Sequence, residues 1–338
     1  MSTAHDLGPV PTRIDVDTDL VRRLVAEQFP HWIDLPVRPV AHGGWDNHTF
    51  HLGAEMSVRL PAAAEYALAV GKEQHWLPRL ATYLPLPIPT PLGAGTPGAG
   101  YPFAWSVHRW LEGDPVTATT LTTGATGGTT GGGTGGTAGG GVDAVRFAVD
   151  LADFLLALQR IDATDGPAPG THNWFRGATL RTYDATVQQA LEALEGRPDT
   201  DVDLGMARRV WATALAARWD RVPRWFHGDV AAGNLLLRGG RLGAVIDFGT
   251  CGVGDPSCDL AAAWTLLDTS GRRAFRDRLA VDEAGWARGR GWALWKSLAT
   301  CAHTADRHDD EDHEAATAAR RALEAIFEEH EDEHADPR

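Results

Sequence analysis

The stretch that decides the fold runs from His227 to Gly249 and reads HGDVAAGNLLLRGGRLGAVIDFG. Two apolar runs, 235–237 and 242–246, flank the pair Gly239-Gly240. A Gly-Gly pair between apolar runs is typical of a two-residue hairpin loop, because both loop positions need a positive φ. The stretch therefore predicts two antiparallel strands joined by a tight turn.

Counting outward from that turn gives a register. Arg238 faces Arg241 and Asn234 faces Val245, so Asp247 is a diagonal neighbour of Asn234 at roughly 7 to 8 Å. Mg²⁺ binds oxygen ligands at about 2.0 to 2.1 Å and usually takes one or two protein carboxylates, together with phosphate oxygens and water. Asn234 and Asp247 are therefore candidate ligands of one Mg²⁺ ion.

Asp229 precedes Asn234 by five positions. This is the spacing of the protein-kinase catalytic loop, H-R-D-x-x-x-x-N, with Gly228 in place of arginine, and Asp247 opens a D-F-G. The Asp229 carboxylate can accept, or simply orient, the proton of a hydroxyl that attacks a γ-phosphoryl group. The pattern predicts a phosphoryl-transfer centre, although Asp and Asn also occur at turns for local reasons and His227 is open to a purely structural reading.

A helix is expected directly after this stretch. Asp255 suits the N-cap and Pro256 the first helical position, and apolar residues follow at helical spacing. Asp255 is therefore interpreted as a cap. Asp259 lies beside the apolar stripe and would need partners if it were buried.

These motifs resemble the aminoglycoside phosphotransferase family, the small-molecule branch of the protein-kinase-like fold. The resemblance implies an α+β, two-lobed enzyme with a small N-terminal lobe of antiparallel sheet and one helix. A larger, mainly helical C-terminal lobe would carry the catalytic hairpin. The expected parts are the nucleotide lobe 1–107, the hinge 108–116, an insertion 117–141 and the catalytic and acceptor lobe 142–338.

The same resemblance implies roles for individual residues. ATP, or GTP, and Mg²⁺ would bind in the cleft between the lobes, with Asp229 as catalytic base and Asn234 and Asp247 as metal ligands. His227, Asp255 and Asp259 would support the catalytic loop.

The nucleotide lobe is testable in the upstream sequence. Gly43, Gly44 and Asn47 lie between two expected strands, where a loop would cover the phosphates, but a plain turn explains these residues equally well. Arg59 occupies the third-strand position that the family gives to lysine, and its planar fork binds phosphate differently. Glu73 is its expected partner, and Glu65 is the competitor.

The hinge is expected after the strand that begins at Trp105. The backbone of Arg109, Trp110 and Leu111 would bind the adenine there. The segment 117–141 follows with 11 glycines and 10 threonines in 25 positions, a composition typical of a flexible coil and unlike a P-loop.

The acceptor pocket is the least defined part. Trp174, Asp184, Trp286 and Trp292 are its candidates, because the family places the acceptor near the segment after Asn173 and because 13 tryptophans is a high count. Aromatic residues at helical spacing are mostly core residues, so a core position stays open for each.

Composition limits the partners. The net charge is -14, which disfavours nucleic acid and anionic membranes and suits a small cationic acceptor, although general solubility explains it as well. No apolar run is long enough to span a bilayer, and three cysteines lack metal spacing, so a cytoplasmic monomer or homodimer with reduced thiols is expected.

His330-Glu331-Asp332-Glu333-His334 matches the H-E-x-x-H zinc pattern. It lies near the end of the chain among acids and histidines, with no apolar face and no third ligand, so a solvated tail is the expected structure.

Three functions remain open from the sequence. The first is a small-molecule O-phosphotransferase, acting on an aminoglycoside in antibiotic resistance or on a macrolide, choline-like or homoserine-like acceptor. The second, a protein kinase, is disfavoured because the short interval between Asp247 and Asp255 leaves no room for an activation segment. The third is an inactive nucleotide-binding module, which the arginine at position 59 suggests.

Overall fold

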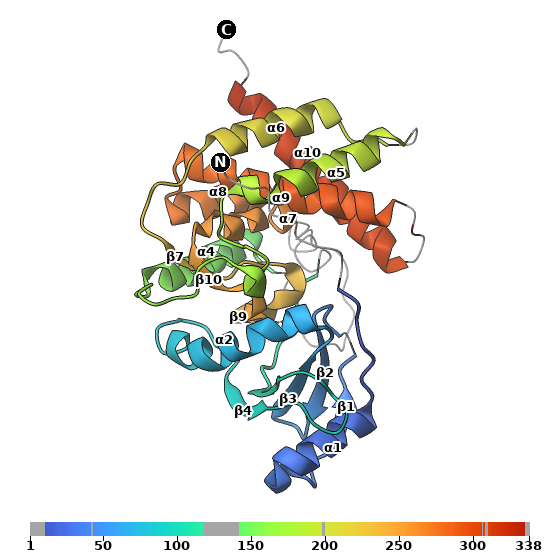
Figure 1. The fold of residues 1–338 in the computed structure, drawn as a ribbon. Helices are drawn as coiled ribbons and strands as arrows, with labels where there is room; N and C mark the ends of the chain where they lie inside the picture. Colours follow the sequence, from blue (N-terminus) through green and yellow to red (C-terminus); the bar gives the residue numbers. More distant parts are fainter. Residues whose placement is uncertain are drawn as a thin grey trace, which may run out of the picture.

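The computed structural model describes residues 11–41, 43–117, 142–197, 200–305, 307 and 310–334. Two lobes lie one above the other in Figure 1, a small lobe that holds an antiparallel sheet and a larger one built mainly of helices. The α+β, two-lobed architecture expected from the sequence is confirmed. The insertion predicted at 117–141 lies, apart from Thr117, outside the described residues, as does His42.

The sheet of the small lobe has the order β1-β2-β3-β5-β4, with every neighbouring pair antiparallel. Its strands are β1 (Val37–Pro39), β2 (Asn47–Leu52), β3 (Met56–Pro61), β4 (Pro91–Gly95) and β5 (Trp105–Arg109). Helix α1 (Thr18–Gln28) closes a core of its own with this sheet, in which Leu24, Leu52 and Trp105 are fully buried.

Helix α2 (Ala64–Leu80) lies in the small lobe next to the large one (Figure 1). It contacts the short 3-10 segments Thr171–Asn173 and Phe248–Thr250, which belong to the large lobe. It therefore carries Glu73 to the boundary between the lobes, and Glu73 is only 5% exposed.

The large lobe is built from α4 (Ala144–Arg160), α5 (Asp184–Glu195), α6 (Leu204–Ala216), α7 (Ala262–Thr265), α8 (Thr269–Leu279), α9 (Glu283–Thr304) and α10 (Asp310–His334). Helix α9 packs against α5, α6 and α10. Because it is surrounded, it is apolar on several sides, and Trp286, Trp292 and Leu294 on it are buried.

The expected hairpin is present, but its register is corrected by one residue. Strands β8 (Leu235–Arg238) and β9 (Arg241–Val245) pair Arg238 with Arg241, as predicted, and then Leu235 with Val245. Gly243 is extra in β9 and forms a bulge, which plain counting from the turn does not reveal. Asn234 therefore lies opposite Ile246, whose N–H donates to the Asn234 carbonyl at 2.9 Å.

Two short strands frame the hairpin. Strand β6 (Asp114–Pro115) pairs with β8, and β7 (Arg224–Phe226) pairs with β10 (Gly252–Gly254). The helix expected after Asp255 begins as a 3-10 segment, Pro256–Ala261, and continues as α7. Asp255 is its N-cap, accepting from the Ser257 N–H at 3.0 Å.

The end of the chain is also corrected. The segment around His330 is not a solvated tail but the last part of α10, and His330 is only 6% exposed. Glu329 accepts from the indoles of Trp264 and Trp286, and Glu333 accepts from Arg290 at 2.7 Å. Its acids face buried arginine and tryptophan groups, which charge counting alone does not show. Among the described residues no cluster of three or more His, Cys, Asp or Glu side chains is arranged for a metal ion.

None of the helices in the described part of the chain is both long enough and apolar enough to span a membrane.

Candidate active site

The loop between β7 and β8 is held from below by a buried carboxylate. Asp259 is fully buried and accepts from the N–H groups of His227 at 2.9 Å and Gly228 at 2.7 Å. Burial raises the pKa of Asp259, and His227 and the two N–H donors oppose that rise. Gly228 has φ 88°, and a Cβ there would lie 2.7 Å from the Thr250 carbonyl oxygen, so this position requires glycine.

His227 links the loop to the end of the hairpin. Its Nδ1 accepts the N–H of Asp229 at 3.2 Å, and its Nε2 donates to the carbonyl of Ile246 at 3.0 Å. The ring also packs edge-on against Phe248. The position of Asp229 is thus fixed relative to Asp247 through one buried side chain.

Asn234 turns its amide nitrogen toward Asp229. The Nδ2 group donates to the Asp229 carbonyl at 3.0 Å and to its Oδ2 at 3.1 Å. Because the nitrogen is engaged on that side, the amide oxygen of Asn234 faces away from Asp229 and can serve as a ligand for a cation.

Asp247 has a strained backbone and a charged partner. Its φ is 65° and its ψ 70°, the left-handed region that a residue with a side chain seldom adopts. Its Oδ1 accepts from Arg59 at 2.7 Å, and Arg59 also lies 3.5 Å from Glu73. The Arg59–Glu73 pair expected from the sequence is present, and Asp247 is a second partner that sequence reasoning missed.

These charges act on one another. Burial disfavours the charged form of Arg59, but Glu73 and Asp247 outweigh it, so the pKa of Arg59 is raised. Burial raises the pKa of Glu73, and Arg59 opposes it. Arg59 is thereby held at the boundary between the lobes as a permanent cation.

Lys296 is a site residue that sequence reasoning missed. It reaches Asp229 from α9, with its Nζ 2.8 Å from Oδ1, and the two side chains are 38% and 34% exposed. Burial alone would raise the pKa of Asp229, but the ion pair with Lys296 and the nearby Arg176 lower it to about 2. Asp229 is therefore a carboxylate at neutral pH.

A compositional signal could have found it. The chain has 31 Lys and Arg residues, and only Lys72 and Lys296 are lysines. Lys72 also lies at the site, where its Nζ donates to the carbonyls of Gly249 at 2.6 Å and Cys251 at 2.8 Å and fixes the segment after Asp247. Where arginine is the general basic residue, a lysine marks a position that needs a compact charge.

Arg176 lies beneath the catalytic loop. It donates to the Gly228 carbonyl at 3.1 Å and to the Tyr183 hydroxyl at 2.6 Å, and its guanidinium lies 4.5 Å from the Trp295 ring centre. Trp174 and Phe175 just before it have φ of 54° and 58°, and this left-handed turn aims Arg176 inward. Isolated residues in that region are not visible in a sequence pattern.

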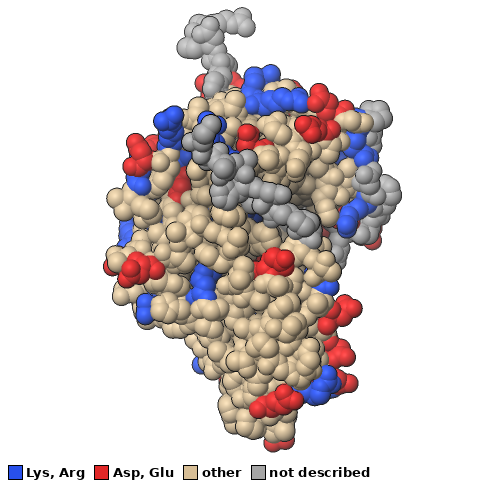
Figure 2. All heavy atoms as spheres, in the orientation of Figure 1, with Lys and Arg blue, Asp and Glu red and all other residues tan. Residues whose placement is uncertain are grey.

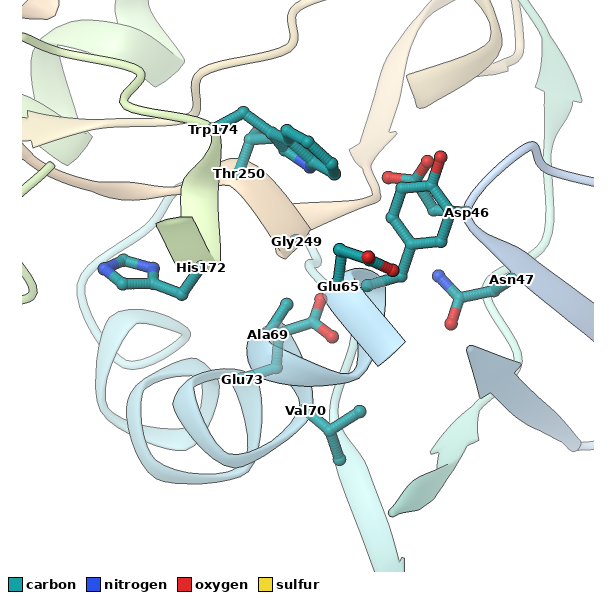
Figure 3. Close-up of a pocket in the computed structure, with 11 residues that line it drawn as sticks. Asp46, Asn47, Glu65, Ala69, Val70, Glu73, His172, Trp174, Gly249 and Thr250 are labelled. Carbon is teal, nitrogen blue, oxygen red and sulfur yellow. The ribbon is translucent and has the colours of Figure 1, made fainter. Parts of the chain in front are cut away.

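The loop before β2 contributes an acid to the cleft. Asp46 and Asn47 line a small cavity with Glu65, Tyr66, Glu73, Trp174 and Thr250, drawn in Figure 3. Burial, together with Asp247 and Asp229, raises the pKa of Asp46 to about 7. The cavity is about 20 Å³, close to the size of one water.

Neither Gly43 nor Gly44 in that loop is required by lack of space or by its backbone conformation. A Cβ on Gly43 would meet nothing within 4 Å, one on Gly44 would lie 3.9 Å from Asn47, and neither glycine has a positive φ. Their role at phosphates stays a prediction.

The hinge is only partly available for a base. The N–H of Arg109 donates to Thr90 at 2.9 Å and that of Trp110 to Glu55 at 2.7 Å, so neither N–H is free for adenine. The expectation for these two donors is corrected. Arg109, Trp110 and Leu111 line a cavity of about 240 Å³ between the β2–β3 turn and the hairpin.

Of the residues predicted to line the acceptor pocket, Trp174 lies at the cleft and the others have partners elsewhere in the large lobe. Trp174 lies at the cleft, and Figure 3 shows it beside Thr250 on the large-lobe side of the cavity. Asp184 instead accepts from the Trp211 indole at 2.7 Å. Trp286 is 1% exposed against Trp264, and Trp292 is 2% exposed behind Tyr183, so both are core residues and the predictions for them are wrong.

The comparisons agree with this arrangement. The model of the phosphotransferase enzyme family matches residues 37–292, and the chain belongs to that family. It is a phosphotransferase with a kinase-like fold that acts on hydroxyl groups. A search of curated proteins finds no match.

Solved structures give the same fold. The GDP complex of wild-type aminoglycoside 2'-phosphotransferase-IIIa is 16% identical with a TM-score of 0.62, covering 92% of this chain and 98% of that one. The gentamicin complex of APH(2")-IIa is 18% identical with a TM-score of 0.58, covering 93% and 99%. Macrolide 2'-phosphotransferase MphH from Brachybacterium faecium is 20% identical with a TM-score of 0.55, covering 89% and 97%.

Proposed function

We propose that this phosphotransferase moves the γ-phosphoryl group of ATP or GTP to a hydroxyl of a small molecule, with Asp229 as the catalytic residue. One observation carries the proposal: Asp229, Asn234 and Asp247 converge where the loop after β7 meets the end of the β8–β9 hairpin. Arg59 adds a largely enclosed cation at the same point, bound to Asp247 and 15% exposed.

The residues fit a magnesium ion. The amide oxygen of Asn234 and the second carboxylate oxygen of Asp247 are hard ligands, and Mg²⁺ commonly takes few protein ligands because phosphates and water complete its shell. Burial and the nearby carboxylates of Asp247 and Asp229 raise the pKa of Asp46, so a cation bound among these acids would be favoured. A bound Mg²⁺ would neutralise charge on the β- and γ-phosphates.

Each side chain at the site would then have a distinct role in the transfer. Asp229, ionised beside Lys296, orients the acceptor hydroxyl and accepts its proton as the oxygen attacks. Asp259 and His227 hold the loop so that little reorganisation is needed. Arg59 is available to the phosphates, and Leu111 or the hinge carbonyls are available to the base.

The acceptor is proposed to be a small hydroxylated compound. The names of the structural neighbours suggest aminoglycosides and macrolides as the first panel, which would make the enzyme one of antibiotic resistance. A protein substrate is disfavoured because β10 pairs with β7 directly after the Phe248–Thr250 segment, leaving no activation segment. We expect a cytoplasmic monomer or homodimer, with nucleotide from the cell pool.

Mass spectrometry after incubation with ATP or GTP, Mg²⁺ and a panel of small hydroxylated compounds that includes these antibiotics tests the proposal. We expect one phosphoryl group on an acceptor, and none when EDTA removes the metal. Transfer only to a protein substrate, or transfer that persists in EDTA, would contradict it.

A further inference from the structure

The two sides of Asp229 differ in charge. The side toward the small lobe holds the acids Asp46, Asp247 and Glu73, and Arg59 pairs with the last two. On the large-lobe side lie the cations Lys296, from α9, and Arg176, from the segment before Tyr183. Both cations act on Asp229 and lower its pKa. The nucleotide and metal belong on the acidic side, so the acceptor meets the basic one.

Figure 2 draws the charged residues on one face of the molecule. On that face Asp and Glu are interspersed with Lys and Arg. The whole chain has a net charge of -14, but Lys296 and Arg176 make the surroundings of the Asp229 carboxylate locally basic on the large-lobe side.

Lys296 lies within reach of any acceptor at Asp229. A hydroxyl oxygen must come within roughly 2.6 to 3.2 Å of a carboxylate oxygen for proton transfer. Oδ2 already faces Asn234 at 3.1 Å, and Oδ1 faces Lys296 at 2.8 Å. A hydroxyl that bonds Oδ1 therefore has the Lys296 ammonium as its neighbour.

Lys296 also has donors to spare. An ammonium carries three N–H groups, and the contact with Asp229 uses one of them. At 38% exposure the side chain is open to solvent, so the other two can meet an incoming molecule. Arg176 is positioned behind it, with its guanidinium over Trp295, the residue before Lys296 on α9.

We propose that the acceptor carries a carboxylate or another anionic group close to the hydroxyl that is phosphorylated, and that Lys296 binds this group. This rests on the proposed function and names its substrate class. An ammonium in that place, as on an aminoglycoside amine, would meet Lys296 and Arg176 with like charge, which disfavours binding. Specificity thus comes from attraction and repulsion at one lysine.

The test compares three acceptors of one length: glycerate, its amide and the matching amino diol, with aminoglycosides and macrolides beside them. We expect wild type to prefer glycerate over the amino diol by about tenfold or more in kcat/KM, the size of a single close charge interaction. Lys296→Glu should reverse this order, while Lys296→Arg, which keeps the charge, should preserve it. The change in preference should lie in the relative KM values of the three acceptors and leave the KM of the nucleotide unaltered, while loss of the ion pair with Asp229 lowers kcat for all three alike.

Other outcomes separate the claims. If Lys296→Glu lowers kcat/KM for all three acceptors equally, Lys296 serves Asp229 or the phosphoryl group and the assignment is overturned. Transfer to aminoglycosides or macrolides without any to glycerate also overturns it, but leaves the phosphotransferase intact. Absence of nucleotide turnover with every compound contradicts the proposed function itself.

Discussion

Arg59 stands where the family places a lysine, and its contacts explain how an arginine can serve there. The fork reaches two carboxylates at once, Glu73 on α2 and Asp247 at the end of the hairpin. A lysine is a point charge and would bind one of them well. The sequence predicted the Glu73 partner from the helix that follows, whereas Asp247 is 188 positions away and no local pattern reveals it.

We expect Arg59→Ala to destabilise the protein by about 3 kcal/mol and to weaken nucleotide binding, because it leaves the buried Glu73 without its charge partner. Thermal unfolding and nucleotide titration measure the two effects. Arg22→Ala is the control, since its ion pair with Asp19 is exposed and should contribute less than about 1 kcal/mol. Equal losses from both substitutions would show that the Arg59 pair is not special.

The cysteines give a second prediction at this scale. Cys251, Cys258 and Cys301 are all buried, and burial raises the pKa of Cys251 to about 11 and that of Cys258 well above its usual value. Because the thiolate is the reactive form, the native protein should react slowly with a maleimide and fully only after unfolding. Rapid labelling of the native protein would argue against these buried positions.

At the scale of elements, the hairpin shows what a pattern can and cannot give. Its strands, its Gly-Gly turn and the pairing of Arg238 with Arg241 follow from the sequence. The bulge at Gly243 does not, because a glycine among apolar residues fits a regular strand as well as a bulge. The positions of strands and turns follow from local sequence. The side of the hairpin on which Asp247 lies depends instead on the unpaired residue Gly243.

Deleting Gly243 tests that bulge. Gly243 is the extra residue of the bulge, so its removal keeps Leu235 opposite Val245 and Asn234 opposite Ile246, as in the native hairpin. We expect Mg²⁺-dependent nucleotide binding to be retained, whereas a hairpin without the bulge would lose it, because the deletion would then shift Asp247 by one position relative to Asn234.

Gly239→Asn is the matched control. That turn position has φ 59° with open space around it, and asparagine tolerates this conformation. Circular dichroism should show that both variants fold. Loss of Mg²⁺-dependent binding in the deletion variant, with Gly239→Asn unaffected, would contradict the bulge at Gly243.

At the scale of the whole molecule, the sequence motifs predict the two lobes, but they do not predict how the end of the chain and two tryptophans pack in the large lobe. The sequence predicts a solvated acidic end, but this segment is a helix whose acids bind Arg290 and two indoles. The sequence predicts Trp286 and Trp292 in the acceptor pocket, but both are core residues of the large lobe. Both predictions fail for the same reason. The partner of a charged or aromatic side chain depends on helices that are distant in the sequence, so a local pattern does not reveal it.

Truncation after Phe327 is therefore expected to destabilise the large lobe. It removes Glu329 and Glu333 and leaves Arg290, only 2% exposed, without carboxylate partners, which costs about 3 to 5 kcal/mol for a buried charge. Thermal unfolding is the readout. Glu331→Gln on the exposed side of the same helix should not change the melting temperature, and an unaffected truncation would restore the solvated-tail interpretation.

Asp229 is proposed as the catalytic residue of a phosphoryl transfer, and a comparison of three proteins decides whether it is. Phosphoryl transfer is measured for wild type, Asp229→Asn and, as control, Asp184→Asn, with nucleotide affinity determined for each. We predict that Asp229→Asn folds and binds nucleotide but transfers about 10² to 10⁴ times more slowly, while Asp184→Asn keeps the wild-type rate. An unchanged rate in Asp229→Asn would remove Asp229 from the mechanism.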